Sequence, residues 1–149
     1  GLAWWPAAGL LIEGDVKQIW FSKVLGAIPI NRPAGYSGPV PPMLNFGWSD
    51  QTVLAVGVQK DIGEQMQLRA GFNYGKSPIG PEDVNANIGS LAVVEKHLSF
   101  GLTRRFGSKV MGSLSWVHAF KNSVTSSVAP LNTIELEQNI VNFQISYQF

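Results

Sequence analysis

Apolar and polar residues alternate at a period of two through much of the chain, most clearly over the last eleven residues, 139–149. Every second residue in this stretch is aromatic or branched: Val141, Phe143, Ile145, Tyr147 and Phe149. The residues between them are polar, apart from Ile140. A strand patterned in this way has one apolar face and one wet face. In a soluble protein the apolar face would be core, whereas in an outer-membrane barrel it faces lipid and the polar face lines the lumen.

The same alternation predicts six strands, over residues 10–23, 51–61, 65–75, 93–106, 109–120 and 135–149. Residues 1–6 look like the tail of a further strand. The connections at 62–64 and 107–108 are short, and the remaining ones are long. The connection over 24–46 holds five prolines and is expected to be a loop. Because outer-membrane barrels have short periplasmic turns and long external loops, the pattern predicts an all-β antiparallel transmembrane β-barrel.

Six strands cannot enclose a barrel alone, because the smallest membrane barrels have about eight. Strand edges left open in lipid would expose unpaired N–H and C=O groups. We therefore expect residues 1–149 to be the C-terminal portion of one larger barrel domain, or one of several copies that complete a barrel together.

Composition agrees with a membrane strand protein and argues against several other classes. Hydrophobic residues make up 45% of the chain and charged residues only 14%, against about 25% charged in soluble domains. The sequence contains no run of about 18 apolar residues that would span a bilayer as a helix. The net charge of +1, with scattered basic residues, gives no electrostatic case for a nucleic-acid partner. Cysteine is absent, which excludes disulfides and thiolate chemistry.

Three stretches go beyond a general barrel pattern: Phe46-Gly-Trp-Ser-Asp-Gln-Thr-Val53, the run LRAGFNYGKSPI over 68–79, and Val94-Glu-Lys-His-Leu-Ser-Phe-Gly-Leu102. In this order they resemble the FadL/OmpP1/TodX family of outer-membrane transporters. The resemblance implies a barrel of about 14 strands, of which this chain supplies the last six. It also implies an N-terminal plug and a lateral opening, neither of which lies in these residues.

For function, the resemblance implies passive transport of long-chain fatty acids or hydrocarbons across the bacterial outer membrane, with no enzymatic step and no cofactor. The expected partners are outer-membrane lipid, the hydrophobic ligand and the barrel-assembly machinery. The aromatic end of the last strand resembles the signal that this machinery recognises, carried here by Phe143, Ile145, Tyr147 and Phe149. Two alternatives are a general porin-like pore for small polar solutes and a soluble lipid-binding barrel.

Six charged residues are expected to line the lumen: Glu13, Asp15, Lys17, Arg69, Glu95 and Arg105. Glu13 and Asp15 share one strand face, as an acid/base pair would. We interpret them instead as lumen charges balanced by Lys17 and by Arg69 or Arg105. Two histidines outside any HExxH pattern make no metal site, and the serines lack a GxSxG context.

The first long connection contains an unusually apolar segment. Its residues Val24, Leu25, Ile28 and Ile30 are our candidates for a ligand entry groove, since an external loop has no structural need for such hydrophobicity. The alternative is that they pack against other loops. Tryptophans and tyrosines near the predicted strand ends fit an aromatic girdle.

Overall fold

A seven-stranded antiparallel sheet organises the chain in a computed structural model, which describes residues 1–31, 34–35, 37–39 and 43–149. The strands lie side by side in sequence order: β1 (Leu2–Ala7), β2 (Leu10–Ile19), β5 (Gln51–Ile62), β6 (Met66–Gly75), β7 (Lys96–Phe106), β8 (Val110–Thr125) and β9 (Thr133–Tyr147). Two further strands, β3 (Ala27–Pro29) and β4 (Met43–Asn45), pair within the first long connection. The helical elements are α1 (Ser22–Leu25) and η1 (Val84–Ala86). No helix of the described ranges is long and apolar enough to cross a bilayer.

The predicted antiparallel all-β fold is confirmed, but the count of six strands was one too few for the main sheet. Residues 2–7 form a full strand, with Trp4 opposite Ile12. Its register shifts between Trp4 and Ala7, a stretch that contains Pro6, which has no N–H to donate. The predicted strand over 10–23 ends early because residues 22–25 turn into α1, and β8 runs beyond 120 through an irregularity after Ala119.

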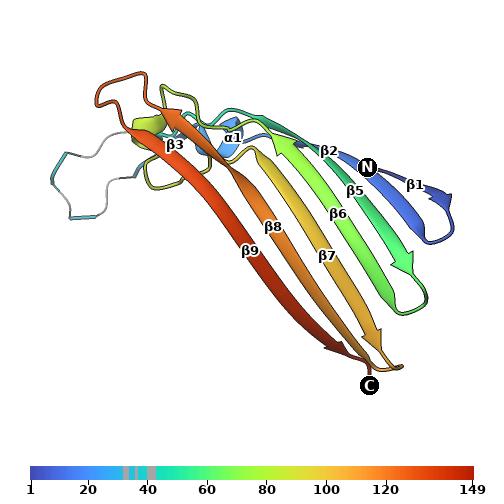
Figure 1. The fold of residues 1–149 in the computed structure, drawn as a ribbon. Helices are drawn as coiled ribbons and strands as arrows, with labels where there is room; N and C mark the ends of the chain where they lie inside the picture. Colours follow the sequence, from blue (N-terminus) through green and yellow to red (C-terminus); the bar gives the residue numbers. More distant parts are fainter. Residues whose placement is uncertain (32–33, 36, 40–42) are drawn as a thin grey trace.

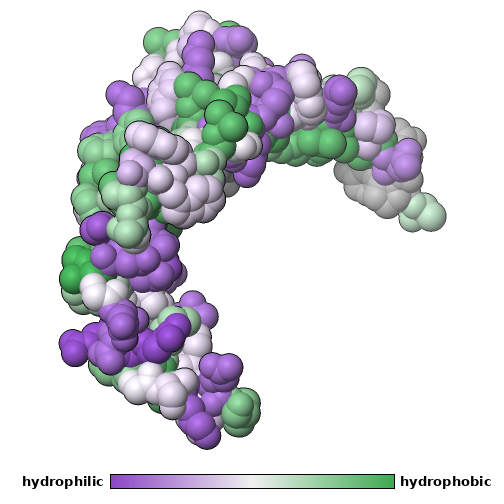
Figure 2. Space-filling model, turned by 90° about the vertical axis from the view of Figure 1, so that its right-hand side faces the viewer, coloured by the Kyte–Doolittle hydropathy of each residue, from purple (hydrophilic) through white to green (hydrophobic). Residues whose placement is uncertain are grey.

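The long connections gather at one end of the sheet and the short turns at the other (Figure 1). In the described ranges the sheet is open, because β1 pairs only with β2 and β9 only with β8. The molecule is therefore an open arch, hollow on one side (Figure 2). Pro33, Pro41 and Pro42 of the predicted loop lie outside the described residues.

The apolar side chains of the strands share one face, which we call the outer face. Cross-strand pairing puts Val58, Ala70, Phe100, Trp116 and Val141 in one row across it. These residues face no protein core: Phe100 is 48% exposed and Val141 67%. The opposite, inner face is mostly polar or small, and its positions on β5 are half-buried although those of the outer face are exposed. Curvature explains the difference, since side chains crowd on the concave side of an arch and spread on the convex side.

The buried core lies at the long-loop end. Ile79, Val84, Val93 and Ile134 are each at most 3% exposed and pack together. Asn87 is buried beside them; its amide nitrogen donates to the carbonyl oxygens of Phe46 (2.6 Å) and Asp83 (2.8 Å). These bonds join two long connections into one packed layer at the mouth of the arch.

Candidate ligand pocket and inner face

A pocket of about 240 Å³ lies where the inner face meets the loop core. Most of its lining is aromatic or aliphatic: Phe21, Trp48, Val53, Pro78, Leu91, Ala92, Val94 and Leu136. Its polar lining residues are Gln51, Asn73, Glu95 and His97. The lining contains no Lys or Arg among the described residues, so the pocket offers an anion no permanently charged partner.

Phe21 and Trp48 form the aromatic wall of the pocket, and their contacts with each other and with Asn87 hold it in place. Phe21 and Trp48 meet edge to face, with ring centroids 5.0 Å apart. The indole Nε1–H of Trp48 donates to Oδ1 of the buried Asn87 at 2.6 Å. An aromatic pair of this geometry contributes about 0.5–1.5 kcal/mol beyond its buried area, so the wall is preorganised for an apolar guest.

A carboxylate ties α1 to the start of β5 next to this wall. The backbone N–H and the hydroxyl of Ser22 both donate to Asp50 Oδ1, at 3.0 and 2.7 Å. These bonds stabilise the charged carboxylate and lower the pKa of Asp50 below its ordinary value. The clamp therefore persists at neutral pH and is lost only as the pH falls through that lowered pKa.

The polar lining residues are bonded to one another or to the backbone. His97 Nδ1 lies 2.9 Å from Asn73 Oδ1, and the backbone N–H of Ser77 donates to Glu95 Oε1 at 2.9 Å. Polar groups that already have hydrogen-bond partners gain little free energy from a polar ligand. The aromatic wall is therefore the part of the pocket that gains most from binding a ligand, an apolar one.

Further along the inner face, Arg69 joins three strands. Its Nε donates to Gln59 Oε1 (2.8 Å), Nη1 to Thr103 Oγ1 (2.9 Å) and Nη2 to Gln67 Oε1 (2.6 Å). Thr103 Oγ1 in turn lies 2.9 Å from Ser113 Oγ on β8. The network extends from β5 to β8 and holds the polar side chains of the inner face in fixed positions.

The structure places the predicted lumen charges on the inner face, on strands that are not all neighbours. Glu13, Asp15 and Lys17 lie on β2, while Arg69 and Arg105 lie on β6 and β7. Glu95 lies just before β7. No direct ion pair joins Glu13 or Asp15 to Arg69 or Arg105 in the described ranges, so the balance of these charges stays a prediction. Strand β5 separates β2 from Arg69, whose guanidinium bonds amides and a hydroxyl instead.

The predicted entry residues lie near the pocket without lining it. Val24 and Leu25 belong to α1 and Ile28 to β3, and Ile30 follows β3. Val24 is 64% exposed and the other three are half-buried. Phe21 and Trp48, which do line the pocket, were not among the predicted entry residues. The sequence signal that could have identified Trp48 was its place in the Phe46–Val53 stretch. For Phe21 the signal was its position just after the alternating residues of β2.

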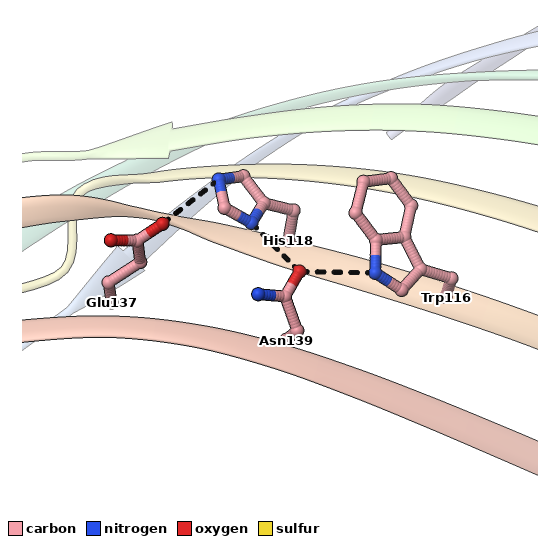
Figure 3. Close-up of polar contacts among 4 residues, drawn as sticks. All are labelled: Trp116, His118, Glu137 and Asn139. Atoms are coloured by element: carbon pink, nitrogen blue, oxygen red, sulfur yellow. Dashed lines mark hydrogen bonds and ion pairs between the residues drawn. The ribbon is translucent and has the colours of Figure 1, made fainter.

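At the long-loop end the outer face becomes polar between β8 and β9 (Figure 3). Asn139 Oδ1 lies 3.2 Å from Trp116 Nε1 and 3.0 Å from His118 Nδ1. His118 Nε2 lies 3.9 Å from Glu137. On β8 and β9 these four residues interrupt the apolar surface, and Phe120, 39% exposed, meets His118 edge to face beyond them.

The residues proposed as an assembly signal continue the apolar surface at the other end of β9. Phe143, Ile145 and Tyr147 are 70%, 65% and 54% exposed on the outer face. The Phe149 ring meets that of Tyr147 edge to face, 5.1 Å between centroids. They are therefore accessible to a partner, and their recognition stays a prediction.

The Arg69 network predicts that lysine cannot replace this arginine. Arg69→Lys keeps the charge but loses the planar fork, so at least one of the three acceptors loses its donor, at about 0.5–1.5 kcal/mol for a hydrogen bond at an exposed position. We expect a lower urea midpoint for unfolding of the whole protein from lipid vesicles. The control is Arg105→Lys, at an exposed position near the strand end; equal losses from both variants would contradict a specific role for the network.

Comparison with known proteins gives matches in structure only. No family model and no curated protein sequence matches the chain. A mutant of the TodX monoaromatic hydrocarbon channel matches 97% of the chain at a TM-score of 0.65 and 18% identity. The toluene transporter TodX of P. putida matches 97% at 0.58 and 16%. The chain covers 33% and 32% of the lengths of these structures. At the level of fold, the resemblance to the FadL/OmpP1/TodX family is therefore confirmed: the chain has the fold of about a third of TodX.

Proposed function

We propose that the chain is part of an outer-membrane β-barrel through which small hydrophobic compounds pass. The observation that carries this proposal is the inverted sheet: apolar side chains cover the outer face on strand after strand, while the inner face is polar. Moving a large apolar side chain out of water is worth about 1.5–3 kcal/mol. A sheet with so many exposed on one face is stable only where that face meets an apolar medium.

The ends of the outer face fit the two borders of a bilayer. Trp116 and the polar group of His118, Glu137 and Asn139 stand at the long-loop end, where aromatic girdles and polar headgroups meet. Arg104 and Tyr147 lie near the short-turn end. The long connections are then external and the short turns periplasmic.

A closed barrel requires more strands than the seven of the main sheet. The free edges of β1 and β9 would leave unpaired N–H and C=O groups in lipid, which the bilayer does not tolerate. We infer that the domain continues beyond this chain to a barrel of about 14 strands, with a plug and a lateral opening as the family resemblance implies. The roughly threefold greater length of the matched TodX structures supports this inference.

The pocket favours a small neutral hydrocarbon over a long-chain fatty acid. An engineered apolar cavity of about 150 Å³ holds a benzene molecule, so a pocket of about 240 Å³ suits a monoaromatic compound. A fatty-acid carboxylate would meet Glu95 there and no Lys or Arg of the described lining. The ligand described for TodX, a monoaromatic hydrocarbon, is of the size and polarity that this pocket suits.

In this account transport is passive. Apolar ligand leaves water for the aromatic wall, gaining roughly 25 cal/mol per Å² of buried apolar surface, and then moves down its gradient. Val24, Leu25, Ile28 and Ile30 would guide ligand toward Phe21 and Trp48. The inner-face charges keep the interior wet and structured, and the aromatic end of β9 serves assembly.

Filling the pocket tests its role directly. Val94→Phe places a larger ring against the lining and should reduce toluene uptake by vesicles containing the whole protein at least fivefold. The control is Val128→Phe, at a loop position that is 54% exposed, which should leave uptake unchanged. Uptake of oleate and swelling in maltose are measured alongside. Oleate carried better than toluene would overturn the ligand class, and maltose swelling without toluene uptake would favour the porin-like pore.

The entry segment is tested separately. Leu25→Ser combined with Ile28→Ser should weaken toluene binding, because it removes apolar surface from the approach to the pocket, while the heat-shifted gel mobility of the folded barrel stays intact. Tritiated toluene binding to detergent-solubilised whole protein gives the readout. Unchanged binding would mean that these residues serve loop packing instead.

A further inference from the structure

The outer face carries a hollow of about 460 Å³ that the transport route does not use. It lies between two neighbouring rows of side chains. One row is Val58, Ala70, Phe100 and Trp116; the other is Lys60, Leu68, Leu102 and Leu114. Its volume is in the range of about 300–1,000 Å³ typical of small-molecule sites.

A small residue beside a rigid wall makes the hollow. Ala70 stands between Val58 and Phe100, so the surface dips where its neighbours project. The rings of Phe100 and Trp116 stack with centroids 6.0 Å apart and planes within 8° of each other. Paired in this way, the two rings form one fixed apolar side of the hollow, and the leucines of the second row form the other.

Lys60 is the outer-face cation of this mostly apolar lining; Arg69 and Ser115 also border the hollow, but the Arg69 guanidinium bonds inner-face residues. The Lys60 side chain lines the hollow, and its Nζ lies 3.3 Å from the carbonyl oxygen of Ala8 in the turn between β1 and β2. The ammonium thus sits toward the short-turn end while the stem lies along apolar surface, the usual position of an interfacial lysine.

Basic residues occur at both ends of the outer face, with Lys96 at the long-loop end, but the described acidic residues of this face are confined to one end. Arg104 lies near the short-turn end of β7, with its guanidinium 5.5 Å from the Phe106 ring. The outer-face acids among the described residues, Glu135 and Glu137, lie at the opposite end. Of the acids nearest to Lys60, Asp61 belongs to the inner face, opposite Gln67, and Glu64 to the turn. The short-turn end of the hollow is therefore complementary to an anion.

We propose that this hollow binds one acyl chain of an anionic phospholipid, with Lys60 contacting the lipid phosphate. The proposal rests on the proposed function, because it requires the outer face to lie in lipid. The acyl chain covers Ala70 between the two rows, and the headgroup lies at the periplasmic border, where basic residues attract anionic lipid by about fivefold each. A lipid held there covers the dip that Ala70 leaves between its larger neighbours.

Native mass spectrometry of the whole protein in detergent tests the site, with dioleoyl phosphatidylglycerol or dioleoyl phosphatidylethanolamine added. We expect the protein to retain one phosphatidylglycerol about fivefold better than the zwitterionic lipid. Lys60→Gln should remove this preference, and Ala70→Phe, which fills the hollow, should reduce retention of both lipids. The controls are Lys96→Gln, a cation at the other end of the same face, and Val141→Phe, which lies outside the hollow.

Equal retention of the two lipids by the unaltered protein would overturn the proposal, as would equal loss of preference in Lys60→Gln and Lys96→Gln. Toluene uptake is measured on the same variants. Toluene uptake without selective lipid retention would contradict only the lipid site. Selective lipid retention without toluene uptake would contradict the transport function but not the lipid site.

Discussion

Under the proposed function, the arrangement of this chain depends on one constraint: a polypeptide in an apolar medium must pair its backbone N–H and C=O groups within itself. The antiparallel ladder from β1 to β9 does this strand by strand. Once the backbone is paired, the period of two decides which side chains meet which medium. The outer face can then carry exposed residues such as Phe143 without a core to receive them. Only the long-loop end, where backbone leaves the ladder, needs a packed cluster of its own around Val84 and Val93.

This division also shapes the candidate site. The inner face is polar, and its side chains hydrogen-bond to one another, as in the Arg69 network. It therefore offers little apolar surface to bind an apolar ligand. The pocket beside Phe21 and Trp48 is the exception, because loop residues bring aromatic surface to the mouth of a polar interior. Under the proposed function, an apolar ligand would be attracted at the entrance and released inside, which suits passive flow more than tight binding.

Much of the fold could be predicted from the sequence, because in strands the side-chain pattern and the structure share one period. Strands β5, β6 and β9 end within about two residues of their predicted limits. Strand β1 was predicted only as the tail of a strand, because Trp4, Trp5 and Pro6 do not alternate between apolar and polar residues. The site was less predictable: Phe21 and Trp48 meet His97 and Leu136 only through long-range pairing. The hydrogen-bond partners of Arg69 could not be predicted either, since charge alone does not say which strands are neighbours.

Site-directed spin labelling of the whole protein in lipid vesicles tests the central claim most directly. The chain contains no cysteine, so single cysteines at Val141, Asn142, Phe143 and Gln144 would carry a nitroxide without background from this segment. The account predicts alternation: labels at 141 and 143 collide mainly with oxygen, which concentrates in lipid, and labels at 142 and 144 with a water-soluble nickel complex. Equal exposure of all four labels to the nickel complex, or an alternation in the opposite sense, would contradict an outer face that lies in the membrane.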